Sequence, residues 1–114
     1  MKVLAVEDDH EFREFLKMFF STKHPDIELQ VASSGEEALQ TFGTFQPDVV
    51  VVDSYMPEMS GQELYGKIKE FAPSTPVISY SGSERGIAWA DGSVDKGGRN
   101  NLDELVAAIR RKAS

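Results

Sequence analysis

The sequence predicts an α/β domain in which helices cover both faces of a single parallel β-sheet. Two patterns support this prediction. Short apolar runs alternate along the chain with segments whose apolar residues recur at helical spacing. One run, residues 49–52, is four consecutive valines, which is typical of a central strand buried on both faces. The chain has 114 residues, 40% hydrophobic and 27% charged, so we expect one folded domain spanning residues 1–114.

The first half of the chain predicts two strands and two helices around the valine run. Residues 2–6 form a short apolar run that suits a buried strand, and residues 27–32 alternate like an edge strand with one wet face. A helix is predicted over residues 10–23 from four apolar residues on one side, which we expect in the core: Phe12, Phe15, Leu16 and Phe19. Ser33 or Ser34 can cap the second helix, which Pro47 ends.

The second half continues the alternation, but its pattern weakens after residue 81. Residues 61–71 predict a helix and residues 76–81 a buried strand. Segment 82–92 contains three glycines and predicts about one turn of helix at most. Residues 93–96 predict a short last strand, and an asparagine caps the final helix, either Asn100 or Asn101.

Five strands with this spacing predict a flavodoxin-like (βα)5 doubly wound parallel sheet of strand order 2-1-3-4-5, with the fourth helix truncated or irregular. In such a sheet, ligands bind at the carboxyl ends of the strands, near strands 1 and 3. Those strands end in carboxylates: Glu7, Asp8 and Asp9 after the first, and Asp53 after the third. We expect Asp9 to cap the first helix rather than to bind a metal.

The side chains at these strand ends predict a phosphoryl-transfer site. Converging carboxylates raise one another's pKa unless a cation lies between them, and a hard divalent cation such as Mg²⁺ prefers oxygen ligands. Two further polar side chains lie at strand ends. Ser81 ends the fourth strand, and Lys96 ends the fifth. A metal, an ammonium group, a hydroxyl donor and a carboxylate nucleophile together suit phosphoryl transfer.

Composition excludes several other classes of protein. The net charge of −7 disfavours direct nucleic-acid binding, because an acidic surface repels phosphate backbones. The chain has no cysteine, which rules out disulfides and cysteine-based zinc sites and suits a cytoplasmic protein. Because no apolar run approaches about 20 residues, we expect no membrane insertion.

Four stretches, in the correct order, resemble the receiver domains of two-component response regulators. VLAVEDD is similar to the first strand and acidic pair of that family, and VVVVDSYMPEMSG to its third strand and following loop. PVISYSG and DGSVDK resemble the fourth and fifth strands. The resemblance covers nearly the whole chain.

This resemblance implies a role for each site residue. Asp53 would be the phosphoacceptor, and Lys96 and Ser81 would contact the phosphoryl group. Mg²⁺, or Mn²⁺ in its place, would be held by Glu7, Asp8, Asp53 and the backbone carbonyl of Tyr55. The phosphoryl donor would be a sensor histidine kinase or a phosphotransfer protein, and phosphorylation would switch contacts with an unidentified downstream protein. Such a domain is no conventional enzyme, although it would catalyse its own phosphorylation and autodephosphorylation.

Three features depart from the family pattern. Lys96 follows Ser81 by only fifteen positions, roughly two helical turns fewer than the family usually has. Ser93 stands where the family often has Tyr or Phe, and Gly97 follows Lys96 in place of a proline. Either output uses another face, or segment 82–92 is itself a mobile switch. We expect Trp89 to pack onto the core there, although it could instead anchor a partner.

Other functions remain open at this point. A pseudo-receiver would bind its partner independently of phosphate, and the shortened fourth helix favours that alternative. A phosphate sink or relay element would use Asp53 and need little output surface. A hydrolase with aspartyl-phosphate chemistry is disfavoured, because the second acid expected two residues after Asp53 is absent and Tyr55 stands there.

Overall fold

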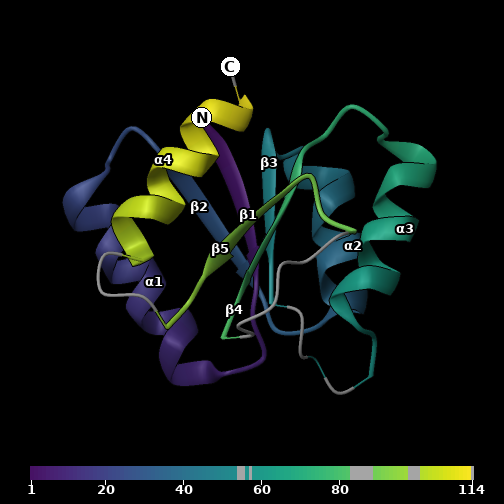
Figure 1. Cartoon of the computed structure of the whole chain (residues 1–114), viewed down its shortest axis with the longest axis horizontal. Coiled ribbons are helices and arrows are strands. Elements are labelled where there is room, and N and C mark those ends of the chain that lie inside the picture. The colour runs from purple at the N-terminus through teal and green to yellow at the C-terminus, as the bar shows by residue number, and fades with distance from the viewer. Residues whose placement is uncertain (54–55, 57, 83–88, 98–100, 114) are drawn as a thin grey trace.

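The computed structural model of the chain describes residues 1–53, 56, 58–82, 89–97 and 101–113. Five strands form one parallel sheet of order β2-β1-β3-β4-β5, as predicted (Figure 1). The elements are β1 (Lys2–Val6), α1 (His10–Lys23), β2 (Glu28–Ala32), α2 (Gly35–Phe45), β3 (Val49–Val52), α3 (Gly61–Phe71), β4 (Val77–Ser81), β5 (Gly92–Asp95) and α4 (Asn101–Ala113). The one helical turn predicted between β4 and β5 was expected around Ile87 to Ala90; residues 87–88 lie outside the described residues, and Trp89 and Ala90 are not helical.

The sheet separates two hydrophobic cores. Helices α1 and α4 cover one face and α2 and α3 the other (Figure 1). The valine run of β3 explains this division, because successive side chains of a strand point to opposite faces. Val49 and Val51 lie in the core beneath α1 and α4, whereas Val50 and Val52 lie in the core beneath α2 and α3. All four valines are buried, which confirms the prediction of a central strand.

Among the described residues, a side-chain cap is seen at the start of α1, α2 and α3. Asp9 accepts a hydrogen bond from the backbone N–H of Glu11, so α1 begins directly after the acidic pair. Ser34 caps α2 and Ser60 caps α3 in the same manner. Asp9 therefore has the predicted role of a cap. Since α1 follows β1 without a long loop, the first turn of α1 lies beside the end of the sheet that carries the acids.

One prediction about the core is wrong in part. Phe15 of α1 is 41% exposed, and the buried residues of this helix are Leu16 and Phe20. Phe12 and Phe19 are only partly buried, packed at the margin of the core. The four-residue spacing from Phe12 through Leu16 to Phe20 is the one that faces the sheet, so the actual apolar stripe is rotated relative to the predicted one.

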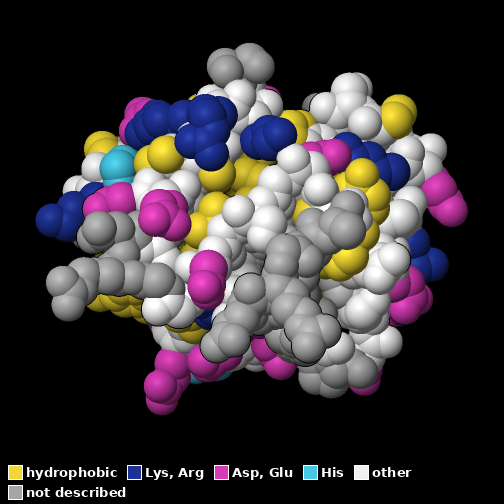
Figure 2. Space-filling view, in the orientation of Figure 1, with side chains coloured by type: hydrophobic (Ala, Val, Ile, Leu, Met, Phe, Trp, Pro, Cys, Tyr) yellow, Lys and Arg dark blue, Asp and Glu magenta, His cyan; other side chains and the backbone are white. Residues whose placement is uncertain are grey.

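Charged side chains are unevenly distributed over the surface. Figure 2 shows Lys and Arg gathered over α4, whose last turn carries Arg110, Arg111 and Lys112, with Asp and Glu along the lower edge. That lower edge lies beyond the carboxyl ends of the strands (Figure 1). In the part of the chain that the structure describes, no helix is long and apolar enough to cross a bilayer.

Candidate functional site

The register of the sheet brings the acidic residues together. Val6 of β1 pairs with Val52 of β3, so the next residues, Glu7 and Asp53, leave neighbouring strands side by side. The backbone N–H of Asp53 donates to the Val6 carbonyl at 3.0 Å and keeps this alignment one residue beyond the strand. Carboxylate oxygens of Glu7, Asp8 and Asp53 all lie within 4.8 Å of one another. The predicted convergence of these three acids is thus seen in the structure.

This cluster offers the donor set of a hard divalent cation. Its three ligand atoms are all carboxylate oxygens, the type that Mg²⁺ prefers. Glu7 and Asp53 are buried, whereas Asp8 is exposed, so the cluster is open to solvent on one side. Mg²⁺ loses its hydration water reluctantly and usually keeps several waters, so an open side suits it. The residues present therefore fit this ion.

Lys96 provides the positive charge of the site. Its Nζ lies 2.6 Å from Oε1 of Glu7 and 3.8 Å from Oδ2 of Asp53. Two contacts fix its backbone: its N–H donates to the Ser81 carbonyl at 2.9 Å, and its carbonyl accepts a hydrogen bond from the Asn101 side chain. The end of β5 is thereby tied both to β4 and to the start of α4. Lys96 bridges the two buried acids, with the shorter contact to Glu7.

Glu7 is the most constrained acid of the cluster. Its second oxygen accepts a hydrogen bond from the backbone N–H of Asp9 at 3.2 Å, and its carbonyl accepts one from the Arg13 guanidinium at 2.8 Å. Burial raises the pKa of the Glu7 carboxyl above its ordinary value, and Asp53 raises it further, while the Lys96 hydrogen bond opposes the shift. A cation bound here would relieve the repulsion that Lys96 alone leaves in place.

The structure describes some of the remaining predicted residues and not others. Ser81 is buried at the end of β4, where it pairs with Asp95 of β5. It therefore lies on the strand next to β3, and its backbone carbonyl accepts the hydrogen bond from the Lys96 N–H. Tyr55, predicted to lend its carbonyl to the metal, lies outside the described residues, as does most of the proposed switch segment. Trp89 packs against the core beneath α2 and α3, as predicted, with its ring 5.6 Å from that of Tyr65.

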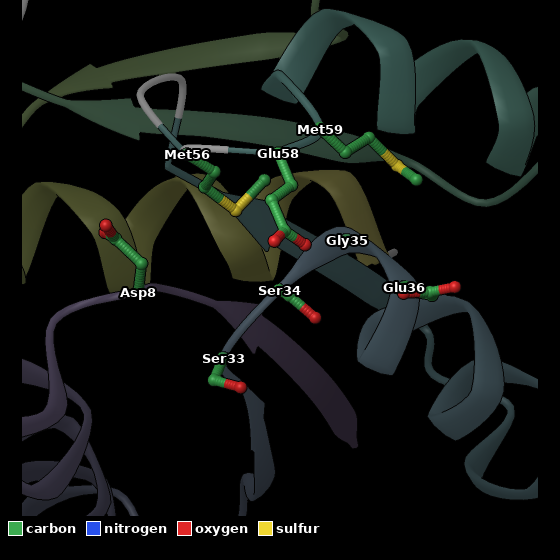
Figure 3. Close-up of a pocket in the computed structure, with 8 residues that line it drawn as sticks. All are labelled: Asp8, Ser33, Ser34, Gly35, Glu36, Met56, Glu58 and Met59. Atoms are coloured by element: carbon green, nitrogen blue, oxygen red, sulfur yellow. The ribbon is translucent and has the colours of Figure 1, made fainter.

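A cavity of about 340 Å³ adjoins the exposed side of the cluster. Figure 3 shows Asp8 at one end of it, with Met56, Glu58 and Met59 facing the start of α2. A Cβ at Gly35 would lie 2.5 Å from the Met59 sulfur, so a larger residue there would force the Met59 side chain to shift. Asp8 lines this cavity and is therefore accessible from it.

Sequence reasoning missed an aromatic pair beside Lys96. The Lys96 ammonium lies over the Phe12 ring, 4.2 Å from its centroid, and Phe12 stacks on Tyr80 of β4 at 6.1 Å. Periodicity assigned Phe12 to the core, and Tyr80 appeared only as part of an apolar strand. The available signal was position: Phe12 stands in the first helical turn after the acidic pair, where a side chain can face the site.

Comparisons with known proteins agree with this geometry. The chain is 33% identical over 116 residues to the response regulator MprA of Mycobacterium leprae, a match covering 96% of this chain and 50% of MprA. It is 39% identical over 84 residues to a protein-glutamate methylesterase/protein-glutamine glutaminase of Nitrosospira multiformis, covering 73% and 23%. The chain thus spans between about a quarter and half the length of these relatives.

A solved structure gives the same result for the fold. The response regulator protein TrrA of Thermotoga maritima, solved in complex with Mg(2+)-BeF, is 30% identical, with a TM-score of 0.81 and coverage of 95% of this chain and 97% of TrrA. TrrA has also been solved in complex with the histidine kinase ThkA. The sequence profile named response regulator receiver domain matches residues 3–108, nearly the whole chain. This chain therefore belongs to the response regulator receiver domain family.

Proposed function

We propose that this chain accepts a phosphoryl group on Asp53 and uses the modification to change its contacts with other proteins. The observation that carries the proposal is the cluster of three carboxylates within 4.8 Å, with the Lys96 ammonium in contact with two of them. A buried nucleophilic carboxylate beside a cation and a metal-type oxygen cluster is suited to phosphoryl transfer. We propose that residues 1–114 form a single receiver domain.

The reaction consists of two displacements at phosphorus. An oxygen of the Asp53 carboxylate attacks the phosphorus of a phosphohistidine, the P–N bond breaks, and the leaving imidazole takes up a proton. Water later attacks the same phosphorus, the P–O bond to Asp53 breaks, and inorganic phosphate is released with the carboxylate restored. Positioning and charge stabilisation carry most of the catalysis in such transfers.

Each neighbouring residue has a separate task in this proposal. Glu7, Asp8, Asp53 and the Tyr55 carbonyl would hold Mg²⁺, or Mn²⁺ in its place. When bound, the ion supplies positive charge to the phosphoryl oxygens and offsets the repulsion between the acids. Lys96 neutralises a second phosphoryl oxygen as a point charge, and the Ser81 hydroxyl donates to a third.

The partners follow from the family and from charge. We propose a sensor histidine kinase or a phosphotransfer protein as phosphoryl donor, supported by the ThkA–TrrA complex of the neighbouring structure. The receiver of the signal is a downstream protein rather than a nucleic acid, since the net charge of −7 opposes binding to phosphate backbones. A cytoplasmic location suits the absence of cysteine.

Incubation with Mg²⁺ and acetyl phosphate, followed by intact-mass measurement, tests the proposal. The wild type should gain one phosphoryl group and Asp53→Asn none. Asp48→Asn is the matched control, because Asp48 precedes β3 at its other end, where its carboxylate accepts from the Lys2 N–H. Equal gains in the wild type and Asp53→Asn would overturn the assignment of Asp53.

Beryllofluoride, which mimics the phosphoryl group on Asp53, separates the remaining functions. Partner affinity that changes with the mimic supports a switching receiver. Unchanged affinity for a bound partner supports the phosphate-independent pseudo-receiver. Phosphoryl uptake and onward transfer without any partner switching supports a sink or relay element.

A further inference from the structure

Metal binding would weaken the contacts that hold the Lys96 ammonium in the structure. In the structure its ammonium is held by Glu7 at 2.6 Å and by Asp53 at 3.8 Å. Both carboxylates belong to the set that would engage the metal, so each contact would weaken when the metal binds. The Lys96 side chain is 24% exposed and could then turn toward solvent. A further contact would keep it at the site until a phosphoryl oxygen reaches it.

Phe12 provides such a contact. Its ring centroid lies 4.2 Å from the Lys96 ammonium, within the distance at which a cation is attracted to an aromatic face. The other described lysine–aromatic contacts are longer, at 5.4 Å for Lys69 and Tyr65 and 5.7 Å for Lys2 and Phe45. Unlike the two carboxylates, the ring has no metal-binding or nucleophilic role. Its attraction for the ammonium therefore persists when the acids are engaged.

Tyr80 keeps the Phe12 ring in place. The two rings stack with centroids 6.1 Å apart and planes 28° from parallel. Tyr80 is 3% exposed and belongs to β4, directly before Ser81, so its ring is fixed by the sheet. Among the described residues its hydroxyl has no hydrogen-bond partner. The Tyr80 side chain therefore contributes here through its ring, which contacts the same Phe12 ring that the Lys96 ammonium contacts.

We propose that Phe12 is a positioning residue for phosphoryl transfer, which keeps the Lys96 ammonium over the acidic cluster while the metal engages its carboxylate partners and until a phosphoryl oxygen reaches it. This inference rests on the proposed function of Asp53 and Lys96. It assigns a role to the first turn of α1 in the chemistry, beyond its packing. Phe12 acts only through Lys96 and touches no reacting atom.

Four substitutions test the inference. Phe12→Leu removes the aromatic face and keeps an apolar side chain, and Phe12→Tyr restores the face. Phe19→Leu is the matched control, because Phe19 is also partly buried on α1 but contacts Phe20 and His24 instead. Phe12→Met serves as a second face-removing variant should Phe12→Leu unfold.

The first measurement is the NMR shift of the Lys96 side-chain protons without metal. The Phe12 ring current should move them upfield in the wild type and in Phe12→Tyr, and this displacement should vanish in Phe12→Leu. The second is the rate of phosphorylation by acetyl phosphate at saturating Mg²⁺. We expect Phe12→Leu to be about three- to tenfold slower, with Phe12→Tyr and Phe19→Leu within about twofold of the wild type. Mg²⁺ affinity should stay within about twofold in all variants.

The outcomes separate this inference from the function on which it rests. Wild-type rates in Phe12→Leu, or equal slowing in Phe19→Leu, would overturn the role of Phe12 while Asp53 chemistry stands. A rate in Phe12→Tyr as low as in Phe12→Leu would do the same. Failure of the wild type to take up phosphate would instead contradict the proposed function, and the Lys96 shift would still show whether the cation–π contact exists.

Discussion

Two lysine–carboxylate pairs of similar length occupy different regions of this molecule. Lys96 and Glu7 lie 2.6 Å apart at the carboxyl ends of the strands, and Lys69 of α3 and Asp91 lie 2.7 Å apart beside β4. Burial raises the pKa of Glu7, whereas the pKa of Asp91 is lowered because several donors outweigh its burial. The distance between the charged groups of an ion pair therefore does not show whether the pKa of its carboxyl group is raised or lowered.

The surroundings of each pair explain the difference. Asp91 accepts from the Val77 N–H at 2.8 Å and from the Tyr65 hydroxyl at 3.3 Å, in addition to Lys69. Glu7 also has donors, but Asp53 lies close to it. The Lys69–Asp91 pair connects α3 to β4, and we call it the brace. In the Lys96–Glu7 pair, Asp53 repels the Glu7 carboxylate, and a bound cation would reduce this repulsion. A carboxyl group whose donors lower its pKa serves the structure, whereas one whose pKa is raised by burial and a neighbouring acid is a candidate for chemistry.

Removing the lysine from each pair should give the largest contrast. We expect Lys96→Met to slow phosphorylation by acetyl phosphate about 100-fold, because a charge aimed at the phosphoryl oxygens is lost. Lys69→Met should leave the rate within about twofold of the wild type. Intact-mass time courses at fixed Mg²⁺ measure both, and similar rates in the two variants would break the distinction.

Removing the acid of the brace should affect folding instead. Asp91→Ala leaves the Val77 N–H and the Lys69 ammonium without this partner, so we expect the free energy of unfolding to fall by about 2 kcal/mol. Urea denaturation measures the change. Phosphorylation of the folded variant should proceed at the wild-type rate, and a slowed rate would show that the brace and the site are coupled.

The two pairs should respond to pH in opposite directions in metal-free protein. The raised pKa of Glu7 means that its contribution to stability is complete below its ordinary value of 4.5 and is lost as pH rises through the folded pKa. The lowered pKa of Asp91 means that its contribution is present above 3.8 and is lost as pH falls through the folded pKa.

Denaturation across pH 3 to 8 in a chelating buffer tests this prediction, which is a smaller effect than that of Asp91→Ala. Relative to Glu7→Gln, the wild type should lose stability on the alkaline side. Relative to Asp91→Asn, it should lose stability on the acid side. Parallel curves for the wild type and Glu7→Gln would contradict the strain assigned to Glu7.

The smallest contrast concerns two tyrosine hydroxyls. Tyr65→Phe removes a hydrogen bond to Asp91, so we expect a loss of about 0.5–1 kcal/mol in unfolding free energy. Tyr80→Phe removes a buried hydroxyl without a described partner, and we expect no loss or a small gain. Burial raises the pKa of that hydroxyl to about 12, with help from the charges of Glu7 and Asp95. A clear loss in Tyr80→Phe would show that its hydroxyl is satisfied.

The sequence was sufficient to predict the sheet and the acids. Strand order follows from alternating elements, and parallel strands place their ends at one edge, so Glu7, Asp8 and Asp53 had to meet. Local capping chemistry also predicted Asp9 as the cap of its helix and narrowed the cap of the second helix to Ser33 or Ser34, of which Ser34 is the cap in the structure. These features depend on neighbours in sequence or on a general rule of topology.

Contacts between elements that lie far apart in the sequence could not be predicted in this way. The actual stripe of α1 depends on how the helix is rotated against the sheet, which is why Phe20 was missed and Phe15 misplaced. The pairing of Lys96 with Glu7 in preference to Asp53 depends on differences of about an ångström between side chains 89 positions apart. The contacts of Asp91 could not be predicted either, because its partners lie on α3 and β4.

Asp26 has a practical consequence for handling the protein. The amino group of Met1 donates to its carbonyl, and its carboxylate pairs with Arg110 of α4 at 2.8 Å. The N and C labels accordingly lie close together, at the end of the molecule opposite the acidic edge (Figure 1). A biotin or fluorophore attached at either terminus would therefore leave the proposed phosphorylation site facing solution. For surface-immobilised kinetics or single-molecule imaging, neither attachment point should obstruct an approaching kinase.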